Sequence, residues 1–237
     1  MIRLYTLTLT ALVVFACTNQ QQPEKKAERY KVSKEEAKLW IKSNQLFKPL
    51  PAFKIDSTDE NLAKIKLGKM LYYDKRLSKN GTISCNSCHN LDTYGVDNQP
   101  TSLGDDGKSR GGRNSPTSLN AFLHVAQFWD GRAKDVEEQA KGPILNPIEM
   151  GMPHADFVVD RIAAIKDYQV LYAKAFPAAG KMTYDNLTSA IGFFERSLIT
   201  PSRFDKFLEN DFEALNDKEK AGLRMFITLG CPTCHMG

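Results

Sequence analysis

The sequence lacks an excess of one charge, a long apolar run and any sustained alternation of apolar and polar residues. Its 32 basic residues nearly balance 28 acidic ones, whereas a nucleic-acid-binding domain normally carries a clustered basic face. The longest apolar stretch, Leu4–Ala16, is far shorter than the ~20 residues that cross a bilayer as a helix. We therefore expect neither nucleic acid as a partner nor a membrane-spanning helix.

Because strand alternation is missing, the remaining periodic signal is helical. Ser33, Ser57 and Asn216 each stand three residues before a glutamate, the pattern of a helix start in which two side chains cap the backbone reciprocally. Residues 90–120 are instead rich in Gly, Ser, Asn, Asp and Pro, which predicts a long irregular loop, and such loops usually carry function. The fold class predicted from these patterns is all-α.

Cysteine is scarce and odd in number, with one single residue and two pairs among five. Cys17 follows a short positive segment and the apolar stretch, so residues 1–16 are predicted to be a secretory signal. Val14–Cys17 resembles the lipobox of bacterial lipoproteins, which implies a lipid anchor on Cys17, a polar tether over 17–32 and a periplasmic location. The alternative is a buried free cysteine in a retained helix.

The two cysteine pairs both belong to C-x-x-C-H segments, the attachment pattern of c-type haem. The segments consist of Cys85, Cys88 and His89, and of Cys231, Cys234 and His235. Thiols about one helical turn apart can bond to the two vinyl groups of one porphyrin, and the adjacent histidine then reaches the iron. There are three alternatives. A thioredoxin-like redox pair needs a βαβ setting that is absent here, and a four-cysteine zinc site leaves the repeated histidine unexplained. Structural disulfides at this spacing would constrain almost nothing. We expect two covalently bound c-type haems.

Several segments on either side of the first haem motif follow one another in a recognisable order. They are Leu67–Ser78, Gly81–Ser84, Gly95–Asn98, Arg113–Thr117, Gln127–Arg132, Glu138–Pro143 and Glu149–Met150. Together they resemble the bacterial dihaem cytochrome c peroxidases, to which the enzymes that mature methylamine dehydrogenase are related. The resemblance implies a periplasmic enzyme of two cytochrome-c-like domains, commonly a homodimer. It would reduce hydrogen peroxide to water with electrons from a small cytochrome c or a cupredoxin.

The resemblance also assigns roles to individual residues. The haem at His89 would be the peroxidatic centre, and the haem at His235 would receive the electrons. Trp129 would lie between the haems, while Glu149 would be the acid/base group with Gln139 beside it. Read without the resemblance, these three are a core tryptophan, a loop glutamate and a helix-surface glutamine.

A calcium ion at the domain interface is a further implication of the resemblance. Asn114 matches one of its ligands and offers the hard oxygen that calcium prefers. Without the resemblance, Asn114 is a turn residue before Ser115 and Pro116.

The sequence departs from the family in the long loop. Many of these peroxidases carry a histidine there that blocks the peroxidatic iron, and Asp105 occupies the matching position. Because aspartate is a poor iron ligand, we expect a five-coordinate haem without reductive activation. His124 is the one rival ligand, although a hydrogen-bonded core histidine is the more common outcome on an apolar run, and His154 is expected at an exposed helix start.

A weak internal repeat suggests two domains. Gly68 and Gly222 stand at matching places before the two haem motifs, and glycine in a helix needs a compensating reason such as a close backbone approach. We expect a peroxidatic domain over 33–200 and the start of a second domain over 201–237. The chain stops shortly after His235, so a truncated second domain with an exposed haem is expected.

Two other functions share the haem motifs. A pure electron-transfer cytochrome would have both irons saturated and no peroxidase activity. A dihaem oxidase acting on a protein side chain would differ from the peroxidase mainly in its distal ligation, and Asp105 keeps this alternative open.

Overall fold

The computed structural model describes residues 30–235, and every regular element in that range is helical, which confirms the all-α prediction. The α-helices are α1 (Lys34–Leu46), α2 (Asp59–Tyr73), α3 (Cys85–Cys88), α4 (Val136–Leu145), α5 (Ala155–Ala163), α6 (Lys166–Ala175), α7 (Tyr184–Glu195), α8 (Arg203–Leu208) and α9 (Asp217–Thr228). Short 3-10 turns are η1 (Lys75–Leu77), η2 (Leu91–Thr93), η3 (Ala121–Leu123) and η4 (Cys231–Thr233). The predicted signal, Cys17 and the tether as far as residue 29 lie outside the described residues. Between residues 30 and 235, no helix combines the length and apolarity needed to cross a membrane.

Two of the three predicted helix starts are found where the sequence places them. Ser33 and Asn216 form reciprocal capping boxes with Glu36 and Glu219. The helix expected at Ser57 begins one residue later, because the Thr58 hydroxyl accepts the hydrogen bond from the Asn61 backbone N–H at 3.2 Å. Local cap chemistry therefore locates these helices to within a residue.

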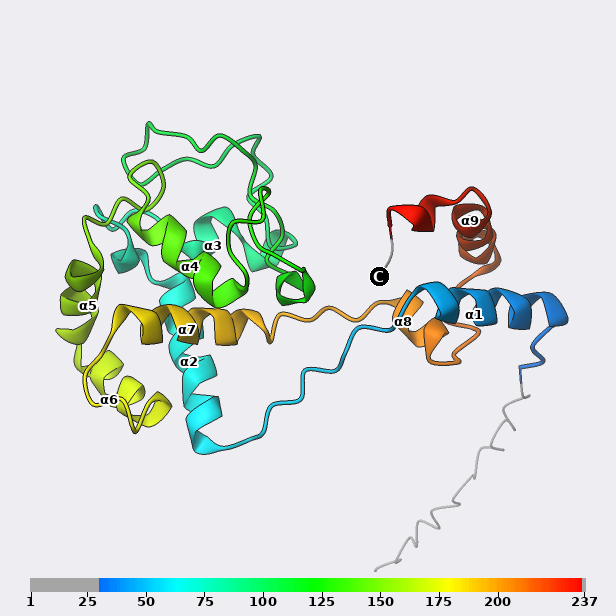
Figure 1. Ribbon diagram of the computed structural model, residues 1–237, viewed down its shortest axis with the longest axis horizontal. Coiled ribbons are helices and arrows are strands. Elements are labelled where there is room, and N and C mark those ends of the chain that lie inside the picture. The colour runs from blue at the N-terminus through cyan, green and yellow to red at the C-terminus, as the bar shows by residue number, and fades with distance from the viewer. Residues whose placement is uncertain (1–29, 236–237) are drawn as a thin grey trace, which may run out of the picture.

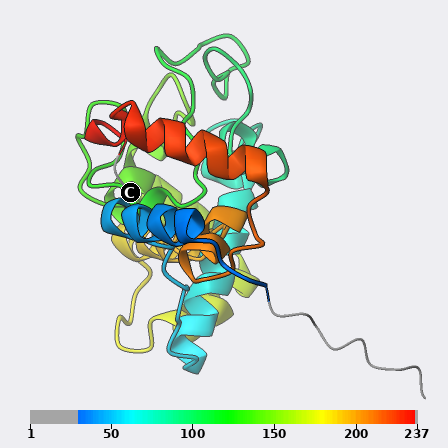
Figure 2. The same ribbon diagram turned by 90° about the vertical axis from the view of Figure 1, so that its right-hand side faces the viewer.

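The helices form two units joined by the irregular segment 47–58 and by residues 198–202, which follow a turn at the end of α7 (Figure 1). The larger unit contains α2 to α7, and the smaller unit contains α1, α8 and α9. In the smaller unit the Trp40 indole donates to the Leu208 carbonyl at 3.0 Å, and Lys220 pairs with Glu36 at 2.6 Å. Figure 2, in which this unit faces the viewer, shows α1 lying beside α9. The expected division at residue 33 assigns α1 to the first domain, whereas its contacts place it with residues 203–228.

In the larger unit α2 packs against α6 and α7, and α7 packs against α4. The backbones of α2 and α7 approach closely at Gly68, where an added Cβ atom would overlap the Ala190 carbonyl oxygen. This is the close backbone approach that the repeat predicts. A Cβ atom added to Gly222 would have no neighbour within 4 Å in the described part of the chain. A close backbone approach therefore does not explain the glycine in the second copy of the repeat. The α2–α7 crossing fixes buried Tyr72 beneath the first haem motif.

Candidate haem pocket

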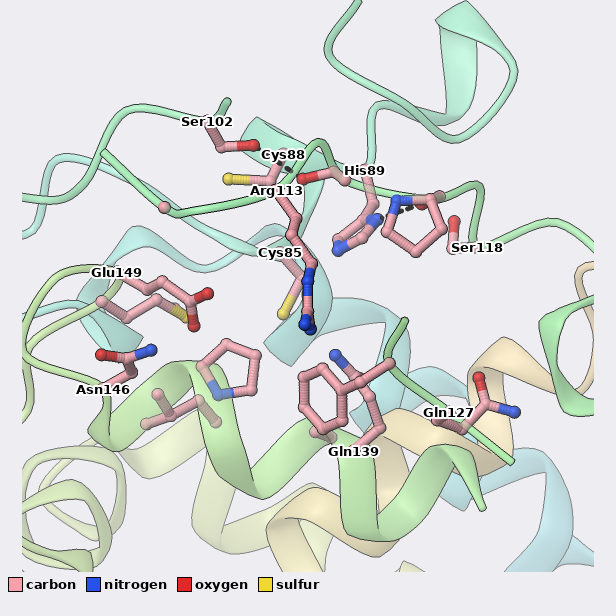
Figure 3. Close-up of a pocket in the computed structure, with 18 of the residues that line it drawn as sticks. Cys85, Cys88, His89, Ser102, Arg113, Ser118, Gln127, Gln139, Asn146 and Glu149 are labelled. Atoms are coloured by element: carbon pink, nitrogen blue, oxygen red, sulfur yellow. Dashed lines mark hydrogen bonds between the residues drawn. The ribbon is translucent and has the colours of Figure 1, made fainter. Parts of the chain in front are cut away.

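A cavity of about 560 Å³ opens in the larger unit, within the usual range for small-molecule and cofactor sites. Its walls come from α3, the loop over 102–118, the turn over 127–132, α4 with its following turn, and the end of α7. Figure 3 shows side chains from these separate segments converging on one space. The long loop predicted over 90–120 therefore supplies part of this site.

Helix α3 presents both thiols of the first motif to the cavity. The Ser84 backbone N–H donates to the Ser87 hydroxyl at 2.9 Å, and the His89 N–H donates to the Cys85 carbonyl at 2.9 Å. These bonds close one helical turn, so Cys85 and Cys88 line the same wall. Both are free thiols, and the wall suits bonding to two edges of one flat ligand.

The His89 ring is held by a hydrogen bond that leaves one ring nitrogen available to bind a metal. Its Nδ1–H donates to the Pro116 carbonyl at 2.9 Å, and because a carbonyl only accepts, the Nε2 atom is left without a proton. Burial lowers the pKa of His89, which favours the neutral ring that binds metals. The Tyr72 hydroxyl donates to the His89 backbone carbonyl at 2.6 Å and fixes the chain at this point.

Glu149 and Gln139 line the same cavity. Gln139 lies on α4, and the chain turns back after that helix because Met150 N–H donates to the Pro143 carbonyl at 3.1 Å. That turn brings Glu149 to the cavity, and Figure 3 shows Gln139 across the space from His89, with Glu149 to one side. Burial raises the pKa of Glu149, against an opposing hydrogen bond from Asn146. Glu149 is therefore not an exposed loop residue, and Gln139 is not a plain residue of the helix surface. Both side chains line the pocket.

Trp129 lies at the rim of the cavity with 59% of its surface exposed, so the core reading of this residue is wrong. Its indole N–H donates to the backbone carbonyl of Asn114 at 2.9 Å. The turn that carries it is closed by the Gln127 N–H, which donates to the Ala133 carbonyl at 2.7 Å. Trp129, predicted to lie between the haems, and Asn114, predicted to bind calcium, are therefore neighbours.

Within residues 30–235, no three His, Cys, Asp or Glu side chains cluster in a way that could hold a metal ion.

Asp105 turns away from the cavity and is buried in the protein. Its carboxylate accepts hydrogen bonds from the Asn80 N–H at 2.7 Å and from the Thr82 hydroxyl at 2.6 Å. Its own N–H donates to the Glu149 carbonyl at 2.8 Å, which holds the loop against the turn that carries the catalytic candidate. Hydrogen bonds of this kind keep the pKa of Asp105 below its usual range although burial opposes them.

The two remaining histidines of the larger unit lie away from the cavity wall. His124 is exposed just after η3, so the prediction of a core histidine is wrong. His154 is exposed at the start of α5, where its Nδ1 accepts from the Phe157 N–H at 3.2 Å, as expected. His89 is thus the histidine that lines the described cavity.

Sequence reasoning missed Glu195, which is only 7% exposed and lines the cavity at the end of α7. Its burial could have been predicted from its position four residues after Ile191, on the apolar face of that helix.

At the second haem motif, Cys231 is half-buried, and Cys234 and His235 are exposed.

An all-α unit in which two thiols and a free imidazole nitrogen open into one cavity is the arrangement of a c-type cytochrome. The sequence profile described as "Di-haem cytochrome c peroxidase" matches residues 62–213. The chain belongs to this family. Membership implies two c-type haems, and the cavity fits one of them at Cys85, Cys88 and His89.

Individual relatives agree with this assignment. The chain is 45% identical over 203 residues to the cytochrome c551 peroxidase of Pseudomonas aeruginosa, covering 84% of this chain and 58% of that protein. It is 36% identical over 174 residues to the methylamine utilization protein MauG of Methylorubrum extorquens, covering 73% of this chain and 49% of that protein.

Among solved structures, a MauG-like protein associated with microbial copper homeostasis aligns with a TM-score of 0.67 at 32% identity, covering 79% of this chain and 55% of that one. The chain spans about half the length of the curated relatives it matches.

Proposed function

We propose that the protein reduces hydrogen peroxide to water, with electrons from a small cytochrome c or a cupredoxin, at a haem attached to Cys85 and Cys88. The observation that carries this proposal is the meeting of Glu149 and Gln139 in the cavity that His89 lines. A carrier that only passes electrons has no need of an acid/base group beside its iron.

The chemistry that the haem supplies when bound is two-electron reduction of the peroxide bond. His89 would hold the haem iron through Nε2, since its Nδ1–H is engaged with the Pro116 carbonyl. Glu149 takes the proton from one peroxide oxygen and delivers it to the other, which leaves as water. Its raised pKa suits this role, because a carboxyl that titrates nearer neutral pH can both accept and return a proton. Gln139 offers an amide that can orient the peroxide. Two electrons and two protons then balance the conversion of one peroxide into two waters.

The rest of the proposal concerns residues around and beyond this cavity. A second haem at Cys231, Cys234 and His235 would receive the electrons, with Trp129 between the two centres. Asn114 would supply one calcium ligand, and its exposed position at the rim leaves room for ligands from elsewhere. Cys17 would carry the lipid that anchors the protein in the periplasm, and two copies would form a homodimer.

One alternative function has support from the comparisons. The similarity to MauG leaves open a dihaem oxidase that acts on a protein side chain. Such an enzyme would share the haem motifs and would oxidise a protein substrate, so a peroxidase assay with a small cytochrome as donor separates the two functions.

The deciding assay measures peroxide-dependent oxidation of reduced cytochrome c by the haem-loaded protein and by Glu149→Gln. We expect kcat to fall by about 10²- to 10⁴-fold, because an amide cannot carry the proton. Exposed Glu213 provides the matched control, and Glu213→Gln should keep the parent rate. Equal turnover by Glu149→Gln and the parent would remove the acid/base role. Absence of peroxide turnover in the parent would leave the electron-transfer cytochrome or the protein oxidase.

A further inference from the structure

Glu195 occupies an unusual position in the haem pocket. It is the last residue of α7, and only 7% of its surface is exposed. It lines the cavity together with Cys85 and His89. No described hydrogen bond reaches its carboxyl group, and within residues 30–235 no fully buried polar side-chain atom lacks a partner, so the carboxyl oxygens keep surface open to the cavity. A carboxylate in so confined a position is less well solvated than one at the protein surface.

The groups that surround Glu195 are already engaged. From α4, Glu137 makes two bonds to Arg196 at 2.7 and 2.9 Å, so the neighbouring arginine does not neutralise Glu195. From α2, the Tyr72 hydroxyl is bonded to the His89 carbonyl. From α3, Cys85 has a thiol that loses its S–H on bonding to haem. Among residues 30–235, no cationic side chain therefore pairs with Glu195.

Burial raises the pKa of Glu195 to about 8, and the negative charge of Glu137 adds to the rise. A ferric haem carries one more positive charge than a ferrous haem. In a buried site the attraction between that charge and a carboxylate is only weakly screened. Oxidised haem therefore favours ionised Glu195, and reduced haem favours the neutral acid.

We propose that Glu195 couples reduction of the pocket haem to uptake of a proton. When a donor protein supplies one electron to the ferric iron, the Glu195 carboxylate takes one proton from water, and the total charge of the pocket is unchanged. The carboxyl thus sets how the haem potential depends on pH. The proposal rests on haem attachment at Cys85 and Cys88, as in the proposed function.

The test is a spectroscopic redox titration of the haem-loaded protein between about pH 5 and about pH 9. In the parent, the pocket-haem potential falls as pH rises, because the carboxylate formed at higher pH stabilises the ferric state. In Glu195→Gln this dependence is reduced. The two curves should meet at low pH, where the acid is neutral, and separate at high pH with the parent lower. A variant lacking Cys85 and Cys88 identifies which spectral component belongs to this haem.

Two further variants keep the test decisive. Glu195→Asp retains a titrating carboxyl and should keep the pH dependence of the haem potential. A side chain that acted only through packing would not predict this result. The same variant serves if Glu195→Gln does not fold. Glu213→Gln, an exposed carboxyl change, should match the parent at every pH. Haem propionates and Glu149 are common to all these proteins, so their contributions cancel.

Two results would overturn the proposal. One is that the haem potentials of the parent and Glu195→Gln change with pH along parallel curves. The other is that neither the parent nor Glu195→Asp shows a pH-dependent haem potential. A parent without covalent haem would instead contradict the proposed function. A parent with haem but no peroxide turnover would leave the potential measurement, and this inference, intact.

Discussion

At the scale of single residues, the hydrogen bonds of Asp105 determine what the long loop contributes to the pocket. The Asn80 and Thr82 donors hold its carboxylate, and its own N–H donates to the Glu149 carbonyl, so Asp105 joins residues 80–82 and the long loop to the turn that carries Glu149. A side chain engaged in this way does not reach an iron in the cavity. The loop therefore acts as a fixed wall that supports Glu149 rather than as a source of a distal ligand.

The consequence is testable by spectroscopy of the oxidised protein as isolated. We expect a high-spin component from the pocket haem, because His89 is the histidine that lines the described cavity and Asp105 points elsewhere. EPR and absorption spectra report this directly. Added cyanide should convert the component to low spin, whereas a spectrum that is entirely six-coordinate and low-spin at the outset would contradict the expectation.

At the scale of elements, the crossing of α2 and α7 determines where the first haem motif lies. Gly68 lets the two backbones approach closely, and Tyr72, one helical turn later, then reaches the His89 carbonyl. Helix packing and ligand orientation are linked in this way, because the residue that fills the interface also bonds to the motif. A change at the crossing should therefore affect both stability and the haem.

Gly68 and Gly222 provide a matched pair for this argument. Gly68→Ala places a methyl group against the Ala190 backbone and should cost about 1 to 3 kcal/mol of unfolding free energy, since backbone cannot give way easily. Gly222→Ala adds a methyl group in open space on α9 and should stabilise by about 0.5 to 1 kcal/mol through helix propensity.

Urea unfolding followed by circular dichroism measures both free energies, and the haem absorption of Gly68→Ala reports any shift at His89. Equal effects of the two substitutions would show that the α2–α7 approach does not require glycine.

At the scale of the whole molecule, two chain segments connect the units, and α1 returns to pack with helices from the other end of the chain. Lys220, only 3% exposed, holds this arrangement through its ion pair with Glu36 at 2.6 Å. The Asp205 carboxylate also accepts from the Leu50 N–H at 2.6 Å, at the start of the connecting segment. The smaller unit thus depends on contacts between residues far apart in sequence.

The ion pair makes the smaller unit sensitive to acid. Hydrogen bonding to Lys220 lowers the pKa of Glu36 to about 2 from its ordinary 4.5. Because the folded value is the lower one, the stabilisation is complete above the unfolded pKa and is lost as pH falls toward 2.

Glu36→Gln should therefore lower the Tm near neutral pH, and its difference from the parent should shrink as the solution is acidified. Thermal unfolding at a series of pH values measures this, with neighbouring exposed Glu35→Gln as the control. A difference that stays constant down to about pH 2 would mean that the pair does not stabilise the folded state.

Much of this protein follows from short-range chemistry that can be read from sequence. Cap side chains act over three residues, so the starts of α1 and α9 could be predicted, and the start at Thr58 was missed by one position. The haem motif is equally local, because one helical turn brings Cys85, Cys88 and His89 together. Glu149 and Gln139 required the family resemblance, since no local pattern indicates that the chain turns back after α4.

The sequence by itself determined the all-α fold class and the two haem-attachment segments, because both depend on residues within a few positions of one another. Only the tertiary structure decided that α1 joins α8 and α9, that Trp129 lies at an exposed rim, that Asp105 faces Thr82, and that Glu195 is buried at the pocket wall. Each of these outcomes depends on which surfaces meet after the chain has folded. Burial and hydrogen bonding across such contacts are set by packing, which local spacing does not specify.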